Sequence, residues 1–223
     1  FSKAIVRLLN EEPIQYILQT TTFYGLEFIC TPSALIPRPE TEELVDWIIK
    51  SETNEITILD IGTGTGCVSV SLANHNSFVV DALDVSSSAL YLAKQNAKQN
   101  KVDVNFIEAD IFKYKSDKKY DLIVSNPPYV RNLEKKKMLN NVLNFEPELA
   151  LFVEDTDPLV FYNTILKFAH NNLIDKGKIY FEINEYLYHE MKALLISLGY
   201  VNIELRKDSF GKFRFVRAMK STI

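Results

Sequence analysis

The stretch ITILDIGTGTGCVSVSLAN (residues 56–74) decides the fold class. It begins with six residues that are mostly apolar or β-branched, as expected of a buried strand. Gly62, Gly64 and Gly66 follow at alternate positions, and a largely apolar segment that suits a helix comes directly after them. A strand, a glycine loop and a helix in this order are typical of an open α/β sheet.

The same alternation of strand and helix continues along the chain. Further strands are predicted over residues 77–85, 104–110, 120–126 and 178–184, and further helices over residues 86–100 and 157–173. Strands separated by helices form βαβ units and therefore a mainly parallel sheet. Near the end of the chain, VNIELRKD (201–208) and KFRFVRAMK (212–220) flank a turn. They predict a terminal hairpin that adds an antiparallel strand at or near an edge.

Three elements are predicted ahead of this sheet. Residues 1–10 carry apolar side chains that suit one short helix, and TTFYGLEFICT (21–31) predicts a hairpin around Gly25. A helix is predicted from Pro39, because proline favours the first helical position and acidic residues follow in the first turn. In the segment PRPETE (37–42), Arg38 and Glu40 either contact a ligand or contribute to capping this helix.

The composition is that of an ordinary globular protein. The 223 residues suffice for one large domain, or one domain with a small appendage, and Phe1 indicates a true N-terminus further upstream. A net charge of −4 argues against a dedicated nucleic-acid binder, and the apolar runs are too short for a membrane span. Cys30 and Cys67 form no CxxC pair and no zinc spacing, so we expect free thiols and no metal site.

The glycine loop and the strand after it indicate a nucleoside-type ligand. The GxGxG spacing differs from the GxGxxG pattern of dinucleotide-binding folds, and the GK[ST] ending of a P-loop is missing. Asp84 ends the second strand, the usual place for a carboxylate that accepts both hydroxyls of a ribose. The simpler alternative is a tight strand-to-helix turn without a ligand. Asp60 either holds this turn or faces a charged part of the ligand.

A second distinctive stretch is DLIVSNPPYV (121–130), in which an apolar strand stops at Asn126. Pro127 and Pro128 have no N–H groups, so this corner presents acceptors: the Asn126 side-chain oxygen and a proline carbonyl. Tyr129 adds a flat ring beside them. Two acceptors and a ring suit a planar –NH2 group, as in a glutamine carboxamide or in adenine. The alternative is a rigid turn that only ends a strand.

Holding both N–H bonds of an –NH2 group would help to overcome its low reactivity. The lone pair of an amide nitrogen is delocalised, which makes the nitrogen a poor nucleophile. Holding both N–H bonds fixes the nitrogen in near-attack geometry, which can supply about 7–11 kcal/mol of a barrier. No strong base is needed, since the extra proton becomes very acidic once the nitrogen is alkylated. The corner therefore predicts alkyl transfer to a nitrogen.

IGTGTG, Asp84 and NPPY, in this order, resemble class I methyltransferases that use S-adenosylmethionine to methylate an amide or amine nitrogen. EEPIQYILQTTTFYGLEF (11–28), ALIPRPETEELV (34–45) and NFEPELAL (144–151) narrow the resemblance to the HemK/PrmC family. Members of that family are glutamine methyltransferases of peptide chain release factors. The likeness runs from about residue 11 to the C-terminal hairpin.

The resemblance implies a fold and a set of site residues. The fold would be that of a class I methyltransferase, with a seven-stranded, mainly parallel sheet and a terminal antiparallel hairpin. S-adenosylmethionine would lie over residues 62–66, Asp84 would hold its ribose, and Ile111 would lie against its adenine. The glutamine amide would donate to Asn126 and Pro127, with Tyr129 beside it. The implied cofactor residues are Gly62, Thr63, Gly64, Thr65, Gly66, Asp84, Ile111 and Asn126; the substrate residues are Asn126, Pro127, Pro128 and Tyr129; and the catalytic residues are Asn126, Pro127 and Tyr129.

The resemblance also implies a partner and a domain division. The substrate would be the glutamine of the Gly-Gly-Gln loop of bacterial class 1 release factors, and S-adenosylhomocysteine would be a product. Residues 1–31 would be a remnant of an N-terminal helical domain plus a hairpin linker, and residues 32–223 the methyltransferase domain. We expect a cytoplasmic monomer with no membrane or nucleic-acid partner.

Two alternatives stay open at this point. An adenine-N6 DNA or RNA methyltransferase would share the NPPY corner, but it would also have to bind phosphates and flip its base. The chain shows no target-recognition domain and only a short basic run, EKKKM (134–138). A non-catalytic binding module of the same fold is the other alternative. Glu146 and Glu148, around Pro147, either shape the mouth of the site or serve structure alone.

Overall fold

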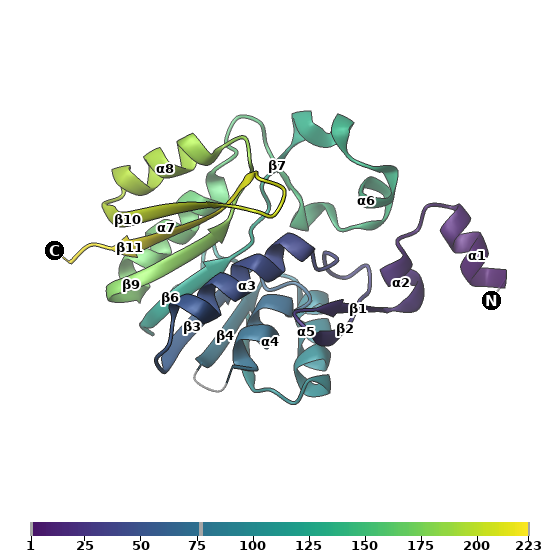
Figure 1. Cartoon of the computed structure of the whole chain (residues 1–223), viewed down its shortest axis with the longest axis horizontal. Helices are drawn as coiled ribbons and strands as arrows, with labels where there is room; N and C mark the ends of the chain where they lie inside the picture. Colours follow the sequence, from purple (N-terminus) through teal and green to yellow (C-terminus); the bar gives the residue numbers. More distant parts are fainter. Residues whose placement is uncertain (1, 76–77, 223) are drawn as a thin grey trace.

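A seven-stranded sheet forms the centre of the computed structural model, which describes residues 2–75 and 78–222 (Figure 1). The strand order is β10-β11-β9-β6-β3-β4-β5. β9, β6, β3, β4 and β5 pair in parallel, whereas β11 runs antiparallel to both of its neighbours. The strands are β3 (Ile56–Ile61), β4 (Phe78–Asp84), β5 (Val104–Glu108), β6 (Tyr120–Ser125), β9 (Leu173–Glu182), β10 (Tyr200–Lys207) and β11 (Phe213–Lys220). The predicted sheet and terminal hairpin are confirmed.

Helices cover both faces of this sheet. Successive residues of a strand point to opposite faces, and in β3 Ile58 packs on one side while Leu59 packs on the other. The Ile58 side is covered by α3 (Pro39–Ser51), α4 (Cys67–Ala73) and α5 (Ser87–Gln99). The Leu59 side is covered by α7 (Val160–Asn172) and α8 (Tyr188–Ser197). Burial on both faces explains why the central strands are apolar almost throughout.

The N-terminal segment joins the sheet through a hairpin. It contains α1 (Ser2–Leu9), α2 (Ile14–Leu18), β1 (Thr20–Phe23) and β2 (Leu26–Ile29). Phe23 and Phe28 are buried in the same cluster as α3 and α4, and the Asn96 side chain of α5 bonds both main-chain groups of Ile29. In contrast, α1 buries none of its residues and lies at the far end of the molecule from the sheet (Figure 1).

Short elements fill the segment between β6 and α7. They are β7 (Val130–Arg131), the 3-10 helix η1 (Asn132–Lys137), α6 (Asn140–Phe145), the 3-10 helix η2 (Glu148–Ala150) and β8 (Phe152–Val153), which pairs in parallel with β7. The sequence did not predict these elements, nor α2 and α8, apart from a loop or short helix at the basic run. Apart from α8, these elements are too short to show a clear hydrophobic period. In α8, the buried pair Met191 and Leu195, four residues apart, was a signal that could have been used.

One predicted strand is longer in the structure than in the prediction. The strand predicted over 178–184 begins earlier, at Leu173, because the polar residues before Lys178 continue the strand without an apolar pattern. The first residue of the strand predicted over 77–85 and of the helix predicted over 1–10 lies outside the described residues. None of the helices in residues 2–75 and 78–222 is long and apolar enough to span a bilayer.

Candidate active site

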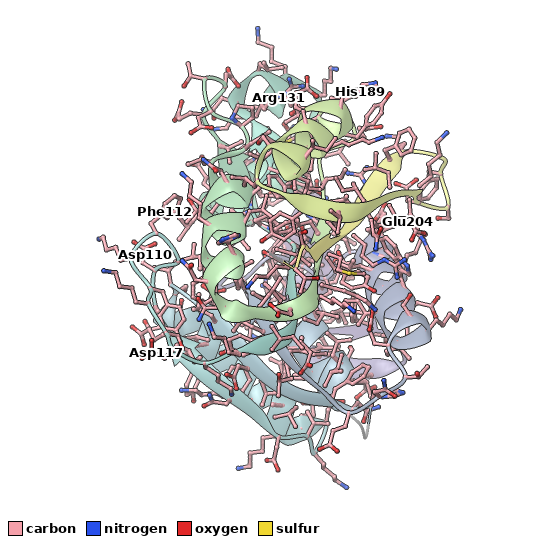
Figure 2. All side chains as sticks on the ribbon, turned by 90° about the vertical axis from the view of Figure 1, so that its left-hand side faces the viewer. Asp110, Phe112, Asp117, Arg131, His189 and Glu204 are labelled. Atoms are coloured by element: carbon pink, nitrogen blue, oxygen red, sulfur yellow. The ribbon has the colours of Figure 1, made fainter. Side chains whose placement is uncertain are left out.

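A cavity of about 410 Å³ opens at the carboxyl ends of β3, β4 and β6. In an open α/β sheet this is the edge where ligands bind, next to the point where the strand order reverses. The glycine loop after β3 and Asp84 at the end of β4 both line it. Asp110 and Phe112, which follow β5, lie in its wall beside α7 (Figure 2). The volume is within the usual range of small-molecule sites.

The glycine loop is held by its own backbone and by the end of β4. The N–H groups of Gly62 and Thr63 donate to the Leu83 carbonyl oxygen at 2.8 and 3.1 Å. Gly66 has a φ of +80°, and a Cβ atom there would lie 3.0 Å from the Ala93 Cβ atom of α5. Only glycine meets both conditions without strain. The loop therefore keeps its main chain exposed to the cavity, and Gly62, Thr63, Gly64 and Thr65 all line it.

Asp84 connects the loop to the next helix. One carboxylate oxygen accepts from the Gly64 N–H at 2.8 Å, and the other accepts from the Ser86 N–H at 2.9 Å. Burial raises the pKa of this carboxyl, and the backbone donors act against that rise. Because each oxygen keeps a further lone pair, Asp84 can still accept two hydroxyl donors from a ligand. Its role at a ribose stays a prediction.

Asp60 lies beneath the same loop. It is buried, it lines the cavity, and it accepts from the Thr63 hydroxyl at 2.6 Å. Burial raises the pKa of Asp60 to about 7. The hydroxyl bond supports the interpretation that Asp60 holds the turn. Cys67 is also buried, and burial raises the pKa of its thiol to about 12, as expected of a packing residue.

The NPPY corner forms a second wall of the cavity. Asn126, Pro127 and Pro128 line it, as does Ile111 from the segment after β5. Tyr129 lies elsewhere: its hydroxyl donates to the buried Glu182 of β9 at 2.9 Å, and its carbonyl oxygen accepts from Asn184 at 3.0 Å. The phenol is therefore hydrogen-bonded within the protein, and Tyr129 is not among the residues that line the cavity.

Two residues that the sequence did not single out hold the Asn126 side chain. Asn126 Nδ2 donates to Thr41 Oγ1 at 3.2 Å, and Thr41 Oγ1 donates to Glu182 Oε2 at 2.7 Å. Thr41 comes from α3, within the segment first interpreted as a ligand contact or a helix cap. The available signals were a polar residue on the buried face of α3 and a glutamate that directly follows the apolar residues Ile179–Phe181 of β9.

The segment before α3 forms a rim over the cavity. Arg38 donates to Glu146 at 2.7 Å, and Glu146 also accepts from the Ile36 N–H at 3.1 Å. Ile36, Arg38 and the neighbour of Glu146, Pro147, line the cavity. The Arg38 side chain makes no capping bond to α3, and Glu40 and Glu148 are not among the lining residues. Glu146 thus shapes the mouth of the site by pairing with Arg38.

The chain is similar to methyltransferases in both sequence and fold. Residues 41–147 match the family described as Methyltransferase small domain. The release factor glutamine methyltransferase of Flavobacterium psychrophilum is 50% identical, over 96% of this chain and 77% of that protein. Its counterpart from Bacteroides thetaiotaomicron is 45% identical, over 96% and 78%. The crystal structure of a methyltransferase from Pyrococcus furiosus has a TM-score of 0.67 at 21% identity, covering 100% of both chains, which supports the fold alone.

Proposed function

We propose a specific reaction for this chain, which belongs to the release factor glutamine methyltransferase family. Membership confirms the resemblance to HemK/PrmC proteins, and the chain is an S-adenosylmethionine-dependent protein-glutamine N-methyltransferase. The proposed acceptor is the side-chain amide nitrogen of the glutamine in the Gly-Gly-Gln motif of bacterial class 1 release factors. S-adenosylhomocysteine would be the second product.

The residues around the cavity fit this cofactor. Residues 62–65, Asp84 and Ile111 line the cavity, whose volume suits a ligand of this size, whereas Gly66 is not among the lining residues. We assign Gly62, Thr63, Gly64, Thr65 and Gly66 to the cofactor, Asp84 to its ribose and Ile111 to its adenine. Bound there, S-adenosylmethionine would supply an electrophilic methyl group on a sulfonium. Asn126 borders both this part of the cavity and the part that we assign to the substrate.

The substrate assignment is supported by the free acceptors of the corner. Asn126 Nδ2 is occupied by Thr41, whereas none of the hydrogen bonds within the described residues uses Asn126 Oδ1. Pro127 is flanked by Pro128, which has no N–H group, and both line the cavity. We propose that Asn126 Oδ1 and the Pro127 carbonyl oxygen accept the two N–H bonds of the glutamine amide. Tyr129 would support the corner from outside the cavity, because its hydroxyl is hydrogen-bonded to Glu182.

These contacts would position the nitrogen without activating it by a base. With both hydrogens held, the plane of the amide would be fixed and its nitrogen kept in one position. Fixed near-attack geometry can lower a barrier by about 7–11 kcal/mol. The alkylated nitrogen is strongly acidic and can release its extra proton to water. The observation that carries the proposal is that Asn126 and the glycine loop line the same cavity.

Mass spectrometry of a release factor tests the reaction directly. The factor is incubated with the protein and S-adenosylmethionine, and its peptides are searched for the mass of one added methyl group. We expect the modification on the glutamine of the Gly-Gly-Gln motif and none on a factor in which that glutamine is alanine. Methylation of adenine in DNA or RNA, with an unmodified release factor, would instead favour the adenine-N6 alternative.

We extend the proposal to the oligomeric state, the cellular location and the domain division of the protein. We propose that the protein acts as a monomer, and light scattering tests this. A substrate that works at the ribosome suits a cytoplasmic location. The division into residues 1–31 and 32–223 is supported by α1, which buries no residue. The burial of Phe23 and Phe28 shows, however, that the hairpin packs on the larger unit.

A further inference from the structure

We propose that Glu182 and Thr41 are positioning residues, which fix the orientation of the Asn126 amide so that its oxygen faces the substrate. This inference rests on the proposed function, because it concerns the side chain that we assign to the glutamine. An asparagine amide has an acceptor at one end and a donor at the other, and the two ends are nearly equal in shape. Rotated by half a turn, Asn126 would present N–H groups to the incoming N–H groups and repel them.

Glu182 determines which groups donate and which accept in this network. An ionised carboxylate can only accept, and its two oxygens accept from Thr41 Oγ1 at 2.7 Å and from the Tyr129 hydroxyl at 2.9 Å. Burial raises the pKa of Glu182, while these two donors and the nearby Arg214 guanidinium favour the ionised form. Glu182 is fully enclosed, at 2% exposure, so water does not compete for its oxygens.

Thr41 in turn determines the orientation of the Asn126 amide. A threonine hydroxyl has a single proton, and in Thr41 that proton is committed to Glu182. Thr41 Oγ1 can therefore only accept from Asn126, and it does so from Nδ2 at 3.2 Å. The opposite orientation would set the amide oxygen against the lone pairs of the hydroxyl oxygen. The acceptor end of Asn126 is thereby directed away from Thr41 and left for a ligand.

Tyr129 gains a role from the same network. Its hydroxyl occupies the second oxygen of Glu182, and its carbonyl oxygen accepts from Asn184 at 3.0 Å. The two residues of the NPPY corner that carry polar side chains are thus both linked to Glu182, one directly and one through Thr41. A segment from α3 and a strand end from β9 determine the polarity of a corner that follows β6.

The test is a pair of substitutions at Thr41 combined with a mutant cycle. Thr41→Val keeps the shape but removes the hydroxyl, and we expect kcat to fall by about ten-fold or more, up to the roughly 10²-fold cost of a misplaced group. Thr41→Ser restores the hydroxyl and should recover most of that loss. In an Asn126→Ala background, Thr41→Val should cause no further loss, because Thr41 acts through Asn126.

Binding of S-adenosylhomocysteine by calorimetry and a thermal melt, measured on every variant, establish that each protein is folded at the assay temperature. The inference is overturned if Thr41→Val works at the wild-type rate, or if Thr41→Ser is as slow as Thr41→Val. It is also overturned if Thr41→Val slows the Asn126→Ala enzyme by the same factor as the wild type. A wild-type rate for Asn126→Ala alone would instead refute the substrate assignment, so the two failures are distinguishable.

Discussion

The two walls of the cavity are held in different ways. The glycine loop is fixed by hydrogen bonds to the end of the next strand, β4. Gly62 and Thr63 donate to Leu83, and Gly64 donates to Asp84. The NPPY corner is fixed by residues distant in sequence, since Asn126 bonds to Thr41, 85 positions away. The cofactor side is thus a property of one βαβ unit, whereas the substrate side needs the assembled sheet.

This difference predicts different effects for substitutions in the two walls. Damage to the glycine loop should lower cofactor affinity or stability, because the loop is part of the framework of the fold. Damage to the NPPY corner should lower turnover and leave cofactor binding largely intact. Substitutions in the two walls should therefore be distinguishable by whether turnover, stability or cofactor affinity changes.

Asn126→Ala should have the largest effect. Loss of a positioned hydrogen-bonding group typically costs about 10²- to 10³-fold in kcat. We expect that loss in single-turnover methylation of a release factor, with the Kd for S-adenosylhomocysteine changed little in calorimetry. Wild-type turnover would show that the acceptor role assigned to this side chain is wrong. A large loss of cofactor affinity would show that the two walls are not separable.

Gly66→Ala should lower the free energy of unfolding. A residue with a side chain at a φ of +80° costs about 1–2 kcal/mol, and the new Cβ atom would lie 3.0 Å from the Ala93 Cβ atom. With overpacking included, we expect a total of roughly 2–4 kcal/mol in urea denaturation.

Gly211→Ala is the matched control for this change. Gly211 has a φ of +81° but no heavy atom within 4 Å of the position a Cβ atom would take. It should show the backbone cost alone, of about 1–2 kcal/mol. Equal losses for the two variants would mean that close packing of the loop on α5 contributes nothing to stability.

Asp84→Ala should weaken cofactor binding more than it slows turnover at saturating cofactor. The change removes the acceptor for the Gly64 and Ser86 N–H groups and the proposed acceptor for a ribose. A hydrogen bond to a charged group contributes about 1.5–3 kcal/mol, which corresponds to roughly ten- to a hundred-fold in Kd. Calorimetry and the KM for S-adenosylmethionine measure it. A fall in kcat with an unchanged KM would contradict the cofactor role of Asp84.

Asp60 should give the protein a pH dependence of stability. Its pKa is raised to about 7 in the folded state, above an ordinary value near 3.8, so the folded state binds the proton more tightly. Its contribution to stability is therefore complete below about pH 4 and is lost as the pH rises to about 7. The slope is on the order of 1 kcal/mol per pH unit across that window. Asp60→Asn cannot titrate, so its unfolding free energy should lack this slope. Parallel curves for the two proteins would refute the raised pKa.

Part of the site could be predicted because its signals are contiguous. The glycine loop, Asp84 and the NPPY corner each occupy one short segment at the end of a strand, and the strand pattern places those ends at one edge of the sheet. Thr41 and Glu182 could not be identified in this way. A threonine in the first turn of a helix suits capping equally well, and a glutamate at the end of a strand suits the surface. Their burial follows only from the packing of α3 on β9.

Local sequence patterns were therefore enough to predict the parallel sheet, the terminal hairpin and the segments that border the cavity, because hydrophobic period, glycine spacing and paired prolines act over a few residues. The orientation of the side chains in those segments depends instead on contacts between distant parts of the chain. It placed the Tyr129 hydroxyl on Glu182 and the Asn126 amide on Thr41. The physical reason is that the direction of a buried hydrogen bond depends on which partner can donate, and these partners come from three separate elements of the chain.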